Sequence, residues 1–375
     1  MNKKIVIAHG HTSIEILHTI TPFVLASKKD SNYKFKFINY KFKNIFRQQG
    51  DLLILIRKYH DGKLSDKKII TELKKLRKNF TKIVYFDDSA AASIVVFCTF
   101  PYIDEYWKRA CLKDKQNYKE KLYGGHIYSN FYSNKFKIND DADYFINPVA
   151  DNDTQFDKLK IAWNIGVGIY PLNKDSITDQ NYLRVRKYLT GLSIISGVGI
   201  LNNFFERNMQ RVIRELKMES SLKKRNFEIS SRFSDLSYRK SVGYQRKICI
   251  DMTKNNKFFL SGYLKKKEFT NEIFNVLGVL SPFGWGEVCY RDFEAIIAGA
   301  YLIKPNMSHL DTWPNVYKRD YYFSLDWDLS DINKMEKIID NIDKCEISVN
   351  AVREYYRSCL QDIVPRCLKM IDNLF

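Results

Sequence analysis

The segment from Ser281 to Pro305 reads SPFGWGEVCYRDFEAIIAGAYLIKP, and it decides how the second half of the chain folds. Two glycines flank a tryptophan, a helical pattern follows over 288–300, and a short apolar run leads to a proline. Since the residues just before it are also apolar, this order predicts a strand, a tight turn, a helix and a second strand. In open α/β sheets ligands bind at the carboxyl ends of strands, so we expect a binding site at this turn.

The residue types at the turn favour a phosphorylated ligand. Gly284 and Gly286 allow the backbone to approach a ligand closely. The start of the helix offers free backbone N–H groups and the positive end of a dipole, which suit a phosphate. Arg291 and Glu294 are three residues apart and share a helix face. A nucleotide sugar would suit this pair, because the cation could bind its phosphates and the carboxylate could bind its hydroxyls. The alternative is that Arg291 and Glu294 form a surface ion pair on an ordinary helix.

Composition sets the broad class. A length of 375 residues is suited to two domains, and 45% hydrophobic with 28% charged residues is typical of soluble proteins. The apolar runs, such as 92–100, are shorter than the roughly 20 residues of a membrane span, and the first apolar stretch is too short for a signal peptide. Seven cysteines without a CxxC pair argue against a disulfide framework or a zinc site. We expect a cytoplasmic protein with reduced thiols.

The net charge of +18 is concentrated at the start of the chain. Residues 1–120 carry 24 Lys and Arg against 12 Asp and Glu. A basic face attracts nucleic acid, anionic lipid or phosphorylated substrates, whereas lysine-rich solvated helices are the plainer explanation. No RRM, KH or zinc-finger signature is present, so nucleic acid is not a predicted partner and a basic nucleic-acid-binding protein stays a rival hypothesis.

Strand-like and helical segments alternate along the chain. Strands are predicted at 3–8, 34–39, 51–56, 82–87 and 143–147, and again at 227–233, 258–262, 277–281, 300–304 and 321–325. Helices are predicted at 14–26 and after Ser65, which is placed as an N-cap. Nearly all-apolar strands separated by helices indicate parallel sheets covered on both faces. With a linker near 215–226, two α/β halves are the simplest architecture.

The segment 228–325 resembles the donor-binding domain of nucleotide-sugar-dependent, family-1/4-like GT-B glycosyltransferases. In that family a strand, a Gly-containing turn and a helix bearing Glu-Ala and a later glycine bind the donor. The matching residues here are Ser281, Gly284, Gly286, Glu294, Ala295 and Gly299. The resemblance implies an α/β fold of two Rossmann-like domains facing a cleft, namely an acceptor domain at 1–215 and a donor domain at 216–350. A kinked helix at 351–375, with Pro365 inside it, would cross back to the first domain.

The resemblance also implies roles for donor-binding residues. Glu294 takes the place of the glutamate that binds the ribose. The family places basic residues early in this domain against the diphosphate, which here are Arg232 or Arg239, and packs a loop on the base, here at Tyr263. Retaining members often have two glutamates eight residues apart. Glu287 lies seven before Glu294, so the stereochemical outcome stays open.

Candidates for the catalytic base lie in the first half. His9 and His11 follow the first strand, where inverting relatives that use UDP-sugars often keep a base histidine, and histidine can accept a proton near neutral pH. Asp87 and Asp88 end another predicted strand and are alternatives to the histidines or would orient them. Any of the four is equally a simple capping residue. No metal-binding or P-loop motif is present, so neither a metal nor a cofactor is predicted.

Taken together, the resemblance implies a glycosyltransferase of the hexosyltransferase type. It would move a sugar from a UDP- or GDP-sugar to a glycan or lipid-linked acceptor in surface polysaccharide biosynthesis (capsule, O-antigen or LPS). Such an enzyme would be cytoplasmic, or peripheral at the inner face of the membrane, with its basic first domain docked on anionic lipid. A nucleotide-sugar epimerase of the same fold is the second alternative.

Overall fold

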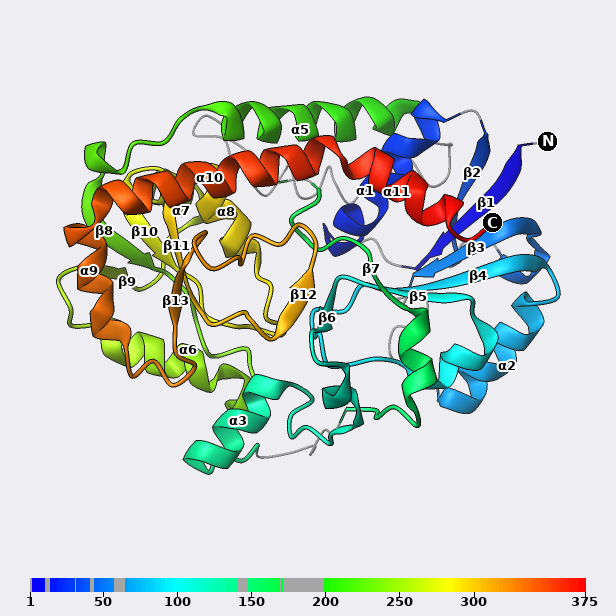
Figure 1. The fold of residues 1–375 in the computed structure, drawn as a ribbon, viewed down its shortest axis with the longest axis horizontal. Helices are drawn as coiled ribbons and strands as arrows, with labels where there is room; N and C mark the ends of the chain where they lie inside the picture. The colour runs from blue at the N-terminus through cyan, green and yellow to red at the C-terminus, as the bar shows by residue number, and fades with distance from the viewer. Residues whose placement is uncertain are drawn as a thin grey trace.

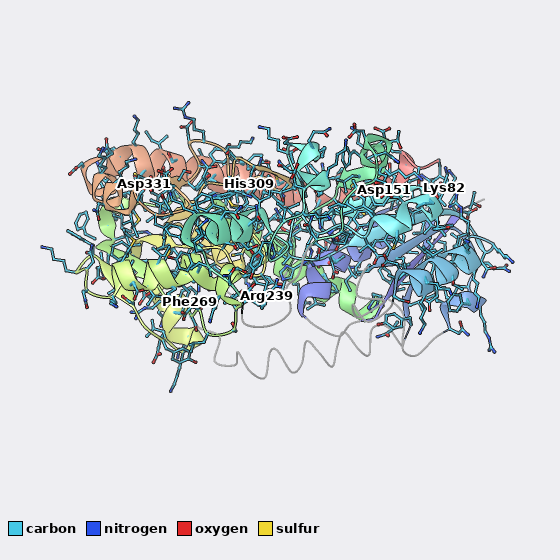
Figure 2. The ribbon with its side chains drawn as sticks, turned by 90° about the horizontal axis from the view of Figure 1, so that it is seen from below. Lys82, Asp151, Arg239, Phe269, His309 and Asp331 are labelled. Atoms are coloured by element: carbon cyan, nitrogen blue, oxygen red, sulfur yellow. The ribbon has the colours of Figure 1, made fainter. Side chains whose placement is uncertain are left out.

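The computed structural model describes residues 2–10, 14–30, 32–40, 44–56, 65–140, 147–168, 170 and 199–375. These residues form two α/β lobes that lie side by side, with a layer of long helices running over both (Figure 1). The view turned by 90° shows the same two lobes, with Lys82 and Asp151 in the N-terminal lobe and Phe269 and Asp331 in the C-terminal lobe (Figure 2).

The N-terminal lobe is built on a six-stranded sheet in which every neighbouring pair is parallel. Its order is β2 (Tyr33–Asn39), β1 (Lys3–His9), β3 (Gly50–Ile56), β4 (Phe80–Asp87), β5 (Glu105–Lys108) and β7 (Leu159–Ile161). The last five residues of β1, β3 and β4 are all buried, as expected for apolar strands with both faces covered. Helices α1 (Ile14–Lys29) and α2 (Asp66–Leu76) belong to this lobe.

The C-terminal lobe repeats the same plan with five parallel strands. Its order is β13 (Phe323–Leu325), β11 (Tyr301–Pro305), β10 (Val276–Leu280), β8 (Asn226–Ser231) and β9 (Phe259–Ser261), with helices α6 (Lys240–Thr253), α7 (Lys266–Ile273) and α8 (Tyr290–Ala298). In both sheets the first strand lies between the second and the third, which is a doubly wound order with a ligand-binding switch point. The prediction of two Rossmann-like domains is confirmed.

A pair of helices crosses from the C-terminal lobe back to the N-terminal lobe (Figure 1). Helix α10 (Ile342–Gln361) packs on α5 (Gly199–Lys217), and α11 (Ile363–Asp372) packs on α1. The break at Asp362 lies three residues before Pro365, which has no N–H to bond the carbonyl of Gln361. The predicted kink and crossing are therefore present, although the helix starts at Ile342 rather than near residue 351.

Arg353 of α10 holds the ends of two other helices. Its side chain is buried and donates hydrogen bonds to the carbonyls of Ile296 and Ile297, at the end of α8 (2.7 and 2.6 Å). It also donates to the carbonyls of Glu215 and Met218, at the end of α5 (2.6 and 2.9 Å). The last carbonyls of a helix lack partners within it and carry negative partial charge, so a guanidinium satisfies both needs. This contact fixes α8 against the crossing helices.

A strand pair and a helix join the two lobes through contacts between residues that are distant in sequence, which no local pattern predicts. Strand β6 (Ala110–Leu112) pairs antiparallel with β12 (Leu310–Thr312). Helix α3 (Ile127–Phe136), although it belongs to the first half of the chain, lies beneath α6 of the C-terminal lobe (Figure 1). The hydroxyl of Tyr132 on α3 donates to the carbonyl of Trp327 (2.6 Å), and Lys135 pairs with Asp328 at 2.5 Å.

Short helices complete the described chain. They are α9 (Lys337–Asp340) and the 3-10 turns η1 (Ile45–Arg47), η3 (Phe97–Tyr102), η4 (Lys115–Lys119), η5 (Asp153–Lys158), η6 (Leu222–Lys224) and η7 (Ile332–Glu336). Residues 143–146 of the predicted strand at 143–147 lie outside the described residues, and so does His11. Across the helices that the structure describes, none combines the length and apolarity needed to cross a bilayer.

Candidate functional site

A cavity of about 400 Å³ lies between the lobes, at the carboxyl ends of strands from both sheets. From the N-terminal lobe it is lined by Asp88, Ser89 and Ala90 after β4, Arg109 and Ala110 after β5, and Asn164 and Ile165 after β7. From the C-terminal lobe it is lined by Tyr238, Arg246, the turn residues Gly284, Trp285 and Gly286, and Val288, Cys289, Tyr290, Arg291 and Glu294. Its size is typical of a small-molecule site.

The glycine turn of the C-terminal lobe packs directly against the backbone of the N-terminal lobe. A Cβ at Gly286 would lie 2.1 Å from the carbonyl oxygen of Ala90, so only glycine allows this contact. The N–H of Gly284 donates to the carbonyl of Gly286 (3.0 Å), and the carbonyl of Gly284 accepts the hydroxyl proton of Tyr128 (2.6 Å). The turn is therefore held by its own backbone and by α3 of the other half of the chain.

The start of α8 is fixed by the buried carboxylate of Asp292. This carboxylate accepts hydrogen bonds from the N–H of Cys289 (2.9 Å), the hydroxyls of Ser281 (2.5 Å) and Tyr317 (2.6 Å), and the ammonium of Lys304 (3.1 Å). Both Asp292 and Lys304 are fully buried. Ser281, a predicted donor-binding residue, thus supports α8 from below and lies outside the cavity lining.

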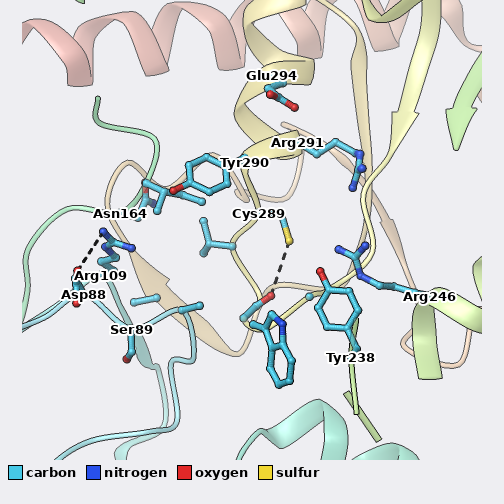
Figure 3. A pocket seen from close by; sticks show the side chains of 17 residues that line it. Asp88, Ser89, Arg109, Asn164, Tyr238, Arg246, Cys289, Tyr290, Arg291 and Glu294 are labelled. Carbon is cyan, nitrogen blue, oxygen red and sulfur yellow. Dashed lines mark hydrogen bonds and ion pairs between the residues drawn. The ribbon is translucent and has the colours of Figure 1, made fainter. Parts of the chain in front are cut away.

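Two guanidinium groups lie on the wall of the cavity that the C-terminal lobe forms (Figure 3). Arg246 donates through Nε to the carbonyl of Phe283 (2.6 Å), and Arg291 donates to the carbonyl of Arg232 (2.5 Å). Burial, and then the like charge of Arg246, lower the pKa of Arg291. Glu294 lies one helical turn after Arg291 and lines the same cavity. Two cations that repel each other in one cavity form a site that an anion would stabilise.

The opposite wall carries a carboxylate that is buried. Asp88 is 2% exposed, and neither of its oxygens accepts a hydrogen bond from the described part of the chain. Arg109 lies 3.9 Å from it and donates to the hydroxyl of Thr19 (2.6 Å). The neighbouring Asp87 is different, because it is fully buried and accepts hydrogen bonds from Lys108 (2.9 Å) and Tyr106 (2.8 Å). Asp88 therefore belongs to the cavity lining and has buried oxygens without a hydrogen bond from the described residues, whereas Asp87 lies in a buried ion pair.

Several predicted site residues lie away from the lining. Arg232 makes an ion pair with Glu272, with its nitrogens 2.6 to 3.1 Å from the carboxylate. Arg239 donates to the carbonyl of Gly124 (2.9 Å). Tyr263 is 89% exposed and His9 is fully buried at the end of β1. The sequence prediction of a diphosphate contact at Arg232 or Arg239 therefore has a competitor in the Arg246–Arg291 pair.

Glu287 is buried at the contact between the lobes. One carboxylate oxygen accepts the N–H of Ala92 (3.2 Å), and the other lies 4.0 Å from Nε2 of His309. Burial raises the pKa of Glu287 and lowers the pKa of His309 to about 4. Figure 2 shows His309 on the side of its lobe that faces the N-terminal lobe, far from Asp331. Glu287 is thus placed to join the lobes and is absent from the lining.

Sequence reasoning missed Arg109, Arg246 and Tyr238. Only Arg246 carried a signal, because it shares the buried face of α6 with Val242 and Cys249, where an arginine needs a partner. The other two reach the cavity from elements that are distant in sequence. Among the described residues, no group of three or more His, Cys, Asp and Glu side chains comes together as a metal site would require.

No protein-family model and no curated protein sequence matches the chain. Solved structures of similar shape include a glycosyltransferase from Rickettsia africae ESF-5 (10% identity, TM-score 0.49, 100% of this chain and 98% of that one). Others are Anabaena Alr3699/HepE in complex with UDP (7%, 0.47, 99% and 100%) and a UDP-N-acetylglucosamine 2-epimerase (8%, 0.39, 99% and 96%). Since these TM-scores are below 0.5, the fold rests on the strand orders and crossing helices described above.

The buried Glu287 generates a prediction about pH and stability. A carboxyl whose pKa is raised by folding binds its proton more tightly in the folded state, so stability falls as pH rises above the ordinary value of 4.5. Glu287→Gln keeps an acceptor for Ala92 and removes the charge. We expect it to increase the free energy of unfolding at pH 8 by about 1 kcal/mol, with the difference from wild type shrinking toward pH 4.5. Urea denaturation across pH measures this.

The matched control is Glu219→Gln, at an exposed position. It should leave stability within about 0.5 kcal/mol at every pH. Because His309 is present in both proteins, the difference between wild type and Glu287→Gln isolates the carboxyl. A variant that is less stable than wild type at pH 8 would contradict the account.

Proposed function

We propose that the cavity binds a nucleotide sugar and that the protein transfers the sugar to the hydroxyl of a glycan or lipid-linked acceptor, as a hexosyltransferase. The observation that carries the proposal is the division of charge across one cavity. Arg246, Arg291 and Glu294 line the wall formed by the C-terminal lobe, and the buried carboxylate of Asp88 lies in the opposite wall beside Arg109 (Figure 3).

The wall formed by the C-terminal lobe, called the donor wall below, has a suitable contact for each part of a nucleotide sugar. The diphosphate would lie between the guanidinium groups of Arg246 and Arg291, which bind phosphate oxygens through several N–H groups at once. Glu294 would accept hydrogen bonds from the ribose hydroxyls, as the family resemblance implies. Gly284 leaves room beside Arg246 and Tyr238 of the lining, because a Cβ at this position would lie 3.2 Å from the side chain of each.

The wall formed by the N-terminal lobe, called the acceptor wall below, would supply the base that the transfer requires. The acceptor hydroxyl attacks the anomeric carbon, the bond from that carbon to the diphosphate oxygen breaks, and the diphosphate leaves with the electron pair. Arg246 and Arg291 would stabilise the charge that develops on the leaving diphosphate. Asp88 would accept the proton from the acceptor hydroxyl. His11 remains a second candidate for this role and lies outside the described residues.

The donor site is tested by nucleotide binding. Arg291→Met and Glu294→Ala should each raise the dissociation constant for UDP or GDP by about tenfold or more, because hydrogen bonds to charged groups contribute about 1.5–3 kcal/mol. Isothermal titration calorimetry measures the constants, and thermal unfolding checks the fold. Arg232→Met is the matched control, since its side chain is paired with Glu272 away from the lining. Unchanged affinity in both variants, or a loss confined to Arg232→Met, would refute the donor site.

The role of Asp88 is tested by turnover. Asp88→Asn should lower the release of UDP from a UDP-sugar, with a panel of methyl glycosides as acceptors, by about 10²–10⁴-fold. UDP affinity should change little, because the nucleotide lies on the other wall. Asp151→Asn, at an exposed site of the same lobe, should keep the wild-type rate. A full rate in Asp88→Asn would assign the base elsewhere, with His11 the next residue to change.

The same assay separates the transferase from an epimerase. An epimerase would interconvert the UDP-sugar without any acceptor, and a transferase would consume it only when an acceptor is present. Product analysis by NMR distinguishes these outcomes. It also reports the anomeric configuration of the product, which the spacing of Glu287 and Glu294 leaves open.

We also propose that the enzyme works at an anionic membrane surface in surface polysaccharide assembly. The support is the outer face of α2, where Lys67, Lys68, Lys74 and Lys75 are exposed while Ile69, Leu73 and Leu76 are buried. Lysines near an anionic bilayer each contribute about 1 kcal/mol of attraction. A cytoplasmic protein with such a face would be held at the inner side of the membrane.

The membrane proposal predicts salt-sensitive binding to vesicles. The protein should sediment with phosphatidylglycerol-rich vesicles at low salt and be released at about 0.5 M salt, where the screening length is only a few ångströms. Changing Lys67, Lys68 and Lys74 to Glu should abolish sedimentation. The matched control changes three exposed lysines of the other lobe, Lys247, Lys254 and Lys257, and should preserve it. Binding that ignores salt, or equal loss in both triple variants, would count against the α2 surface.

A further inference from the structure

Trp285 is a large apolar side chain that is left in contact with solvent beside the cavity. It is the central residue of the Gly284–Trp285–Gly286 turn, it lines the cavity, and 46% of it is exposed. Two other tryptophans, Trp107 and Trp163, are fully buried in the N-terminal lobe. A half-exposed indole that also lines a cavity can stack on a ligand that has an apolar face.

The position of the indole is well defined. Gly286 rests on the carbonyl of Ala90 and the Gly284 carbonyl is bound by Tyr128, so the backbone on both sides of Trp285 is fixed. The ring of Tyr238 lies 5.4 Å from the indole at 37°, and the guanidinium of Arg239 lies 5.8 Å from it. A ring that is already held in place loses little conformational entropy when a ligand stacks on it.

The surroundings of the indole match one class of ligand. A pyranose ring presents C–H groups on one face and hydroxyls around its rim. The turn that carries Trp285 touches Ala90, and the residues just before Ala90 are Asp88 and Ser89, which line the same cavity. The cavity therefore offers an aromatic face and, on the wall that carries Asp88, the polar side chains of Ser89, Arg109 and Asn164 for the hydroxyls of a sugar ring.

We propose that Trp285 is a stacking platform for the pyranose ring of the acceptor. This inference rests on the proposed function and adds the class of acceptor, a glycan that presents a pyranose at its reactive end. With the acceptor ring on Trp285, its rim hydroxyls face Asp88, the group proposed to take the proton. The platform thus aligns the acceptor hydroxyl with the base.

The alternative occupant of an aromatic platform is the nucleobase of the donor, and the layout of the cavity disfavours it. Glu294, the proposed ribose contact, and Tyr238 lie at opposite ends of the cavity, with Arg291 and Arg246 between them (Figure 3). Trp285 contacts Tyr238 and so belongs to the end away from Glu294. A base attached to the ribose would lie beyond Glu294, whereas the sugar and the acceptor would lie toward Trp285.

The test is a residue-specific titration by NMR of the full-length protein saturated with UDP. The chain has five tryptophans, and the indole N–H signal of Trp285 is identified by its loss in Trp285→Phe. Methyl glucoside, methyl galactoside and methyl mannoside are added in turn, with glycerol as a polyol that has no ring. We expect the glycosides to shift the Trp285 signal in a saturable way and glycerol to leave it unchanged.

Two variants of Trp285 then test whether the change in its NMR signal reports binding of the glycoside to the indole. Glycoside binding measured from the shifts of neighbouring backbone amides should weaken by about fivefold or more in Trp285→Ala, and by less than about threefold in Trp285→Phe, which keeps an aromatic face. UDP affinity should stay within about twofold in both, since the nucleotide lies elsewhere. Trp327→Phe is the matched control, because Trp327 is outside the lining and its indole N–H is bonded to the carbonyl of Asn306 (2.8 Å).

The outcomes separate this inference from the function on which it rests. If UDP binds but no glycoside moves the Trp285 signal, or if Trp285→Ala binds glycosides as well as wild type does, the platform is wrong and the donor site stands. If uridine or UDP alone shifts the Trp285 signal and Trp285→Ala loses UDP affinity, the platform holds the base instead and the inference is overturned. If UDP does not bind at all, the proposed function fails first.

Discussion

The buried carboxylate of Asp292 is the contact on which the site depends. It joins the end of β10 through Ser281, the neighbouring β11 through Lys304, the first turn of α8 through the N–H of Cys289, and the following loop through Tyr317. A buried charge is costly unless every lone pair is used, and here four donors use them. Because the direction of α8 follows from this arrangement, so do the positions of the three α8 side chains that line the cavity, Tyr290, Arg291 and Glu294.

The same turn is the reference point for both lobes. Tyr128 binds it from α3, Ala90 packs against Gly286, and Glu287, immediately after the turn, accepts the N–H of Ala92. Each of these contacts reaches the turn from the N-terminal lobe. A side chain in place of Gly286 would therefore collide with the backbone of Ala90 and separate the walls of the cavity. The distance between the two walls of the cavity is therefore set by contacts of the backbone, which vary less than contacts between long side chains.

Local patterns were enough to predict the elements around the site. Apolar runs and a helical period predicted β10, α8 and β11, and the three-residue spacing predicted that Arg291 and Glu294 share a face, because these features depend only on neighbours in sequence. The sequence could not separate Asp87 from Asp88. Alternation along a strand gives adjacent residues opposite directions, but which one meets Lys108 depends on the pairing of β4 with β5.

Sequence patterns also could not show which arginine lines the cavity, because that depends on contacts between residues far apart in the chain. Arg232 follows a strand end and was the natural candidate for the diphosphate, yet it pairs with Glu272, 40 residues later in the sequence. Arg246 reaches the cavity from the middle of α6 because α6 packs beside the turn, where the Phe283 carbonyl accepts its Nε–H. Such positions follow from tertiary packing, which no spacing rule contains.

In the proposed reaction, the charged side chains assign a different role to each wall of the cavity. Cations line the wall where the diphosphate would leave with an electron pair, and a buried carboxylate lies in the wall where a proton would be released. Electrostatic effects of this kind are stronger at a partly buried site than in bulk water, and groups that are already in place need not reorganise during the reaction. Placing the two functions on different lobes means that the catalytic alignment exists only while the lobes stay in contact at the glycine turn.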